Sequence, residues 1–62
     1  MLKYRVIKDF TASCCSRSFK RSEILAYAYT DDKQQSILID AYGIGHKLDE
    51  GSIKTFLEVV DG

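Results

Sequence analysis

The side chains best suited to covalent or metal chemistry are two adjacent cysteines, Cys14 and Cys15, and a single histidine, His46. A cysteine nucleophile needs a neighbouring base, and His46 is the one histidine that could supply it. Adjacent cysteines close a disulfide ring only with strain, so we expect no structural disulfide between them. A zinc site would need further ligands, of which His46 is the only soft one. We therefore expect reduced thiols in a loop, with neither a metal ion nor a cofactor.

Two pairs of neighbouring carboxylates could in principle act as general acid and base. Asp31 with Asp32 and Asp49 with Glu50 lie in polar, turn-like stretches, where solvated side chains are expected rather than a catalytic pair. The Gly-Ile-Gly stretch at 43–45 is too short for a phosphate-binding fingerprint, and it predicts a tight turn with positive φ at one or both glycines. These patterns predict that the protein is not an enzyme.

Charge is unevenly distributed along a chain whose nine basic and nine acidic residues cancel. Residues 1–22 hold six basic residues and one acidic residue, whereas residues 23–62 hold three basic and eight acidic residues. This asymmetry fits either a charged partner surface or pairing of the two halves within the fold.

Two apolar runs, residues 24–30 and 36–42, form the centre of the chain and are separated by the polar stretch 31–35. β-Branched and aromatic residues dominate both runs, which predicts an antiparallel β-hairpin with a loop of about five residues. Alternation along the first run places Leu25, Tyr27 and Tyr29 on one face. Asp40 interrupts the second run, and we expect it to face solvent.

The flanking segments must cover this hairpin. Residues 2–10 alternate with a period of two and predict a strand. The polar stretch 11–23 predicts a long loop or an irregular hairpin, pinned to the core by Phe19. Residues 46–48 predict a short return strand.

The C-terminal segment is ambiguous, with Ser52 as a fair helix N-cap. Residues 53–60 carry a helical stripe, but they also fit a 3₁₀ turn at 53–55 followed by a strand at 56–60, which the β-branched residues favour.

Three segments resemble motifs of the SH3 family. Val-Ile-Lys-Asp-Phe at 6–10 is similar to its first-strand motif, residues 18–25 resemble the segment that closes its first long loop, and residues 53–59 resemble its 3₁₀ turn and last strand. The resemblance implies one all-β domain over residues 1–62, a small SH3-like barrel of about five antiparallel strands with a short 3₁₀ or helical turn before the last strand. It also implies a core near Tyr4, Val6, Phe19, Leu25, Tyr27, Ile37, Ile39 and Leu57.

The function expected from these features is protein binding, as an adaptor or inhibitor, in a small bacteriophage or bacterial accessory protein. The chain lacks the Trp and Pro of the peptide-binding SH3 members, so we expect a partner other than a proline-rich peptide. Surplus apolar residues on the hairpin and a basic loop indicate a partner with an acidic surface or a strand edge, or self-association. The expected partner-binding residues are Arg17, Lys20, Arg21, Tyr27 and Tyr29.

The alternative function is nucleic-acid binding by a small barrel, in which basic residues contact the phosphate backbone of the nucleic acid and aromatic residues stack on its bases. Zero net charge and a pI near 6.5 favour the protein-binding interpretation. No apolar run approaches the ~20 residues of a membrane span, and the charged N-terminus does not look like a signal peptide, so we expect a cytoplasmic protein that does not bind membranes.

Overall fold

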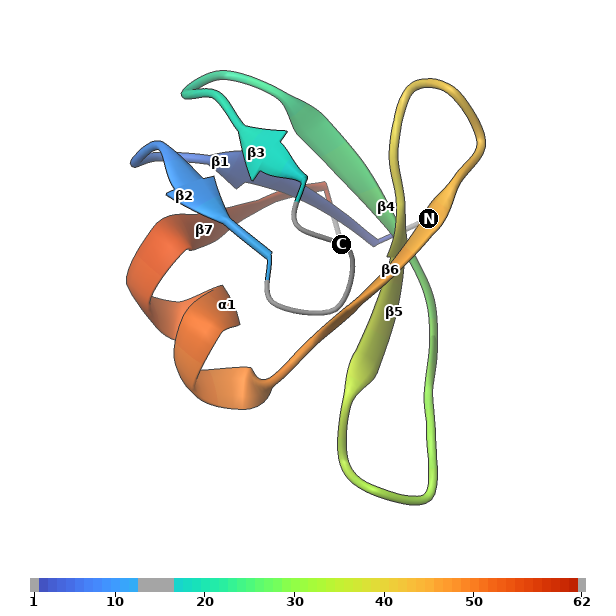
Figure 1. The fold of residues 1–62 in the computed structure, drawn as a ribbon. Coiled ribbons are helices and arrows are strands. Elements are labelled where there is room, and N and C mark those ends of the chain that lie inside the picture. Colours follow the sequence, from blue (N-terminus) through green and yellow to red (C-terminus); the bar gives the residue numbers. More distant parts are fainter. Residues whose placement is uncertain (1, 13–16, 62) are drawn as a thin grey trace.

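The computed structural model describes residues 2–12 and 17–61 (Figure 1). The predictions for Cys14 and Cys15 lie outside these residues. The elements are β1 (Lys3–Val6), β2 (Phe10–Thr11), β3 (Ser18–Phe19), β4 (Ile24–Thr30), β5 (Ser36–Ile39), β6 (Gly45–Leu48), α1 (Glu50–Phe56) and β7 (Leu57–Asp61).

Five strands form one antiparallel sheet in the order β6-β5-β4-β1-β7, and β2 pairs with β3 in a separate two-stranded ribbon (Figure 1). The prediction of a mostly β chain with about five antiparallel strands and a short helical turn before the last strand is confirmed. The closed barrel is not: in the described residues β6 and β7 remain the two edges of an open sheet. The predicted strand at 2–10 is divided into β1 and β2.

The predicted central hairpin is present as β4 and β5, but a β-bulge changes which side chains share a face. Tyr27 pairs with Leu38 and Tyr29 pairs with Ile37, so Ala28 has no cross-strand partner. Leu38 and Ile37 are consecutive on β5 and therefore point to opposite faces. Tyr27 faces the core and Tyr29 faces outward, which corrects the prediction of one shared face, because a bulge inserts one residue into the alternation.

The loops of both hairpins are built in the same way around an aspartate. Asp31 Oδ1 accepts hydrogen bonds from the backbone N–H groups of Lys33 at 3.0 Å and Gln35 at 2.9 Å. The backbone N–H of Asp31 donates to the carbonyl of Gln35 at 2.8 Å and closes the loop. The loop therefore spans residues 31–35, the five residues predicted from the sequence.

In the second loop Asp40 takes the place of Asp31. Its Oδ1 accepts from the backbone N–H groups of Tyr42 at 2.8 Å and Ile44 at 3.0 Å, and its own N–H donates to the carbonyl of Ile44 at 3.0 Å. The expectation that Asp40 faces solvent is wrong: the residue is buried. The carboxylate turns back over the loop because these backbone donors need an acceptor.

The fourth residue of each loop adopts a left-handed backbone conformation. Gly43 has φ 81°, and Gln34 at the equivalent position has φ 66°. The predicted positive φ at 43–45 is thus confirmed at Gly43, whereas Gly45 belongs to β6. Glycine tolerates this conformation and glutamine does not do so readily.

The ambiguous C-terminal segment follows the second predicted alternative, a helical turn and then a strand, with an α-helix in place of the 3₁₀ turn. The helical stripe over residues 53–60 does not form one helix, because residues 57–60 are extended. Helix α1 has its N-cap at Asp49 rather than at Ser52, and the chain becomes extended at Leu57. Strand β7 then pairs antiparallel with β1. The β-branched residues 59 and 60 lie in the strand, as their conformational preference predicts.

The core lies between the inner face of the sheet, the β2–β3 ribbon and α1. Of the eight predicted core residues, four belong to the buried core cluster, and Tyr4 and Tyr27 pack against it. Ile37 is buried and Ile39 half-buried on the outer face of the sheet. The buried apolar residues are Val6, Ala12, Phe19, Leu25, Ile37, Leu38, Leu48 and Leu57. Within residues 2–12 and 17–61, no helix has the length and apolar character needed to cross a membrane.

Candidate functional site

The structure separates the five predicted partner-binding residues. Tyr27 is half-buried, and its hydroxyl lies 2.7 Å from Oγ1 of Thr30, whereas Tyr29 is 58% exposed on the opposite face of the sheet. Lys20 and Arg21 are exposed in the turn between β3 and β4. Arg17 is turned inward. These five side chains therefore do not form one continuous surface.

Arg17 belongs to a polar cluster between the ribbon and the sheet. Its Nη2 donates to Oε1 of Glu23 at 3.0 Å, and its Nε lies 3.7 Å from Oδ2 of Asp40. The guanidinium carbon also lies 4.3 Å from the ring centre of Phe19, a cation–π contact. The positive charge of Arg17 thus serves pairing within the fold, one of the two roles that the charge asymmetry predicted.

The centre of this cluster is a buried pair formed by Asp40 and His46. Their side chains are 1% and 3% exposed, and Nε2 of His46 lies 2.7 Å from Oδ2 of Asp40. The hydrogen bond from His46 lowers the pKa of Asp40 to about 2, assisted by the backbone N–H groups of Ile44 and Tyr42 and opposed by burial. A carboxylate in this state only accepts hydrogen bonds, so Nε2 of His46 carries the proton. The pair joins the 40–44 loop to β6.

Glu23 completes the cluster on the solvent side. Its Oε2 accepts a hydrogen bond from the backbone N–H of Lys20 at 2.6 Å. This bond lowers the pKa of Glu23, with a further contribution from Arg17, while burial opposes the shift. Glu23 therefore fixes the turn at 20–23, which presents the Lys20 side chain to solvent.

Three phenylalanine rings connect this cluster to the surface. Phe10 stacks on Phe56 with ring centres 4.7 Å apart and an interplanar angle of 10°, and it stacks on Phe19 at 5.0 Å and 21°. The register of the ribbon places Phe10 opposite Phe19, which is completely buried. Phe19 in turn meets the ring of His46 edge-on at 5.0 Å. The ring of Phe10 is thus held in place from both sides.

Phe10 and Phe56 are among the residues that line a hollow of about 440 Å³, which we call the aromatic groove. The groove lies between β2 of the ribbon, the end of β6 and α1, with Gln35 beside them. A smaller hollow of about 190 Å³ shares three of its residues and extends to Lys20. The residues lining the groove are Asp9, Phe10, Thr11, Ala12, Gln35, Lys47, Leu48, Asp49, Ser52 and Phe56.

The two ends of the groove differ in their polar groups. At the ribbon end, Nζ of Lys20 lies 4.0 Å from Oδ2 of Asp9, whose Oδ1 accepts from the backbone N–H of Arg21 at 2.7 Å. At the helix end, Oγ of Ser52 donates to Oδ1 of Asp49 at 2.5 Å, and this bond lowers the pKa of Asp49. The side chain of Arg21 lines a separate hollow with Arg5 and Glu58.

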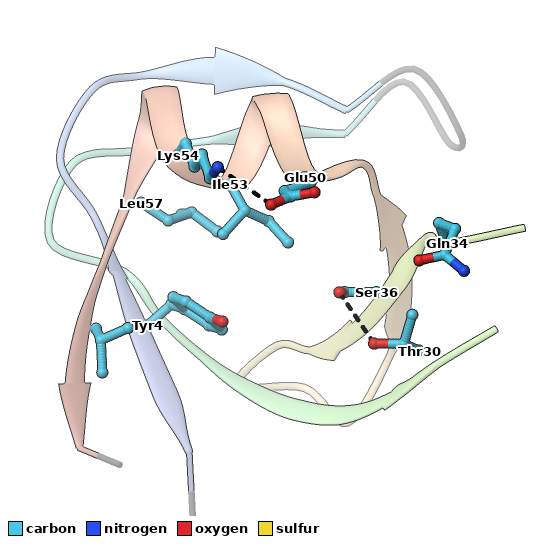
Figure 2. A pocket seen from close by; sticks show the side chains of 9 residues that line it. Tyr4, Thr30, Gln34, Ser36, Glu50, Ile53, Lys54 and Leu57 are labelled. Atoms are coloured by element: carbon cyan, nitrogen blue, oxygen red, sulfur yellow. Dashed lines mark hydrogen bonds and ion pairs between the residues drawn. The ribbon is translucent and has the colours of Figure 1, made fainter.

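A second hollow, the side pocket, lies on the other side of α1 (Figure 2). Its volume is about 420 Å³, and its lining residues are Tyr4, Thr30, Gln34, Ser36, Glu50, Ile53, Lys54, Leu57 and Val59. Figure 2 shows Tyr4, Ile53 and Leu57 on one side and Thr30, Ser36 and Gln34 on the other, with α1 above them. Residues of the same short helix, α1, therefore line both hollows.

Sequence reasoning named neither hollow and missed the buried pair. The spacing from Asp40 to Gly43, typical of an Asx-type loop, was the available signal that this aspartate turns inward. Among the described residues, no cluster of three or more His, Cys, Asp or Glu side chains is arranged to hold a metal ion.

Comparisons of the chain with protein-family models, with curated proteins and with solved structures give no match, so the interpretation of the groove and the pocket depends on their geometry.

Proposed function

We propose that this chain is a non-enzymatic, SH3-like protein-binding module, an adaptor or inhibitor, whose aromatic groove takes an extended segment of an acidic partner. The order of elements supports the SH3-like part of the proposal. A ribbon follows the first strand, two hairpins come next, and a short helix precedes the last strand. The three segments with SH3-like motifs include Phe10, Phe19 and Phe56, the stacked rings.

The aromatic groove is the observation that carries the proposed function. Peptide-binding grooves combine a rigid aromatic floor with a few polar groups that fix orientation. Here the stacked rings of Phe10 and Phe56 belong to the lining of the groove, and Phe19 holds Phe10 in place from the core side. Little conformational entropy is lost when a ligand meets rings that are already fixed, which favours binding.

Charge at the ribbon end indicates what the bound segment carries. Lys20 is exposed there, and its Nζ lies 4.0 Å from Oδ2 of Asp9, whose Oδ1 accepts a hydrogen bond from the backbone N–H of Arg21. An acidic residue of the partner, placed beside the apolar residues that cover the groove, would pair with the Lys20 ammonium. A solvent-exposed pair of this kind contributes modestly to affinity, about 0.2–1 kcal/mol.

A selection from random linear peptides displayed on phage tests the proposal. We expect enriched peptides that combine apolar residues with an acidic residue, and backbone amide shifts that map their binding to Phe10, Ser52 and Phe56. Lys20→Glu should weaken binding about 3- to 10-fold, because it replaces attraction with repulsion. Arg21→Glu makes the same charge change on the neighbouring residue, outside the groove, and should change affinity less than twofold.

The absence of any enriched peptide, or equal effects of the two charge reversals, would overturn the proposal. Oligonucleotide binding whose affinity falls steeply with salt, in a chain that selects no peptide, would support the nucleic-acid alternative instead.

A further inference from the structure

We propose that the side pocket is a second binding site, which accepts an uncharged apolar residue of a peptide chain and contacts its backbone through the Gln34 amide. The site lies beyond the aromatic groove and does not depend on it. Its volume of about 420 Å³ is within the range of about 300–1,000 Å³ typical of ligand sites.

The apolar wall consists of Tyr4, Ile53, Leu57 and Val59. Val59 pairs with Tyr4 in the sheet, and Tyr4 packs against the core, so both side chains lie on the inner face. Val59 is nevertheless 59% exposed. An inner-face side chain is left open to solvent here because the sheet does not close over it, and an apolar ligand group would cover it.

The polar wall stands opposite and carries three uncharged groups (Figure 2). The hydroxyls of Thr30 and Ser36 are 3.5 Å apart, a long contact that leaves the Ser36 hydroxyl able to turn toward a ligand. Within the described part of the chain, the side-chain amide of Gln34 forms no hydrogen bond, so its acceptor and two donors are available.

Gln34 also occupies a position where its backbone is strained. The equivalent residue of the other hairpin loop is Gly43, and both loops are closed by the same set of hydrogen bonds. Glycine would fit position 34 better than glutamine does. Strained residues are commonly retained where their side chains are used, and the side chain of Gln34 lines the pocket.

The charges of the lining sum to zero, which favours a neutral ligand. The charged residues of the lining are Glu50 and Lys54, one turn apart on α1, and Nζ of Lys54 lies 3.1 Å from Oε1 of Glu50. Each neutralises the other, so the rim attracts neither a cation nor an anion. An apolar side chain with its flanking peptide groups matches an apolar wall, an amide and a neutral rim, whereas a free amino acid brings two charges.

Titration of the full chain with N-acetyl-leucinamide and N-acetyl-phenylalaninamide, followed by backbone amide shifts, tests this assignment. We expect saturable shifts at Gln34, Ser36 and Val59 with a Kd of about a millimolar, as small ligands of this size allow. N-acetyl-lysinamide, N-acetyl-aspartic acid amide and free leucine should bind at least fivefold more weakly.

Two loop variants separate a binding role of Gln34 from a structural one. Gln34→Gly should raise Tm and yet weaken probe binding about tenfold, because it relieves the backbone and removes the amide. Gly43→Gln places the same side chain in the other loop, away from the pocket, and should lower Tm without changing affinity. Val59→Ser, at an exposed position, should weaken binding about threefold.

The proposal is overturned if neither probe gives a saturable shift, or if the shifts map to Phe10 and Phe56 instead. Unchanged affinity in a stable Gln34→Gly variant, or preference for a charged probe, would equally overturn it. The failure of the aromatic groove to select peptides would leave these results unaffected, since none of the pocket-lining residues lines the groove.

Discussion

Exchanging residues between the two hairpin loops should change stability in opposite directions. We expect Gln34→Gly to stabilise the protein and Gly43→Gln to destabilise it, because both positions have a left-handed backbone, with φ 66° and φ 81°. The two loops share their hydrogen bonds, so each serves as the control for the other.

The magnitude follows from two opposing terms. A left-handed backbone costs an L-residue about 1–2 kcal/mol, while glycine lowers stability by about 0.4–1 kcal/mol through the greater freedom of the unfolded chain. The net change is about 0.5–1 kcal/mol in each direction. A Cβ at Gly43 would meet no atom within 4 Å, so steric clash adds nothing to the loss.

Thermal and urea unfolding monitored by circular dichroism provide the measurement. For a domain of this size, 1 kcal/mol shifts Tm by about 4–8 °C, so we expect an increase of about 2–8 °C for Gln34→Gly and a similar decrease for Gly43→Gln. A decrease of Tm in Gln34→Gly would refute the reasoning, because it would mean that the glutamine side chain stabilises the loop by more than its backbone strain costs.

Two further predictions concern the core and the buried pair. Leu38→Ala, at a completely buried position, should lower the free energy of unfolding by about 2–5 kcal/mol in urea titrations, whereas Ile24→Ala, at a position that is 43% exposed, should cost less than half as much. Asp40 should stabilise the fold in a pH-dependent manner. Its folded pKa of about 2 lies below the ordinary 3.8, so its contribution is present above pH 4 and is lost as the pH falls from about 4 to 2. Asp40→Asn should therefore flatten the stability profile in this window, and a wild-type slope that the variant retains would contradict the assignment.

The parts of the fold governed by local pattern could be predicted from the sequence. The central hairpin, its five-residue loop and the return strand followed from alternation and turn chemistry. The bulge could not be predicted this way, because Ala28 looks like any other strand residue. One unpaired residue was enough to reverse the expected orientation of Tyr29.

The candidate sites were harder to predict from the sequence, because they depend on contacts between segments that are distant in the sequence. Arg17 was predicted to face a partner, but it meets Glu23 and Asp40 once the ribbon folds over the sheet. The aromatic groove likewise requires Phe10 and Phe56 to stack across 46 positions of the chain. Burial of Asp40 depends on His46, and residue type alone does not indicate that pairing.

The bulge in β4 makes one position of the chain tolerant of a change in length. Because Ala28 has no counterpart on β5, its deletion would keep the pairs on both sides, from Ala26 with Ile39 to Thr30 with Ser36, and each side chain would keep its face. A deletion elsewhere in the strand would move a series of side chains to the opposite face of the sheet. Evolutionary variants of this chain that are one residue shorter in β4 should therefore align with a gap at position 28, and their hairpins should twist less, since bulges increase local twist.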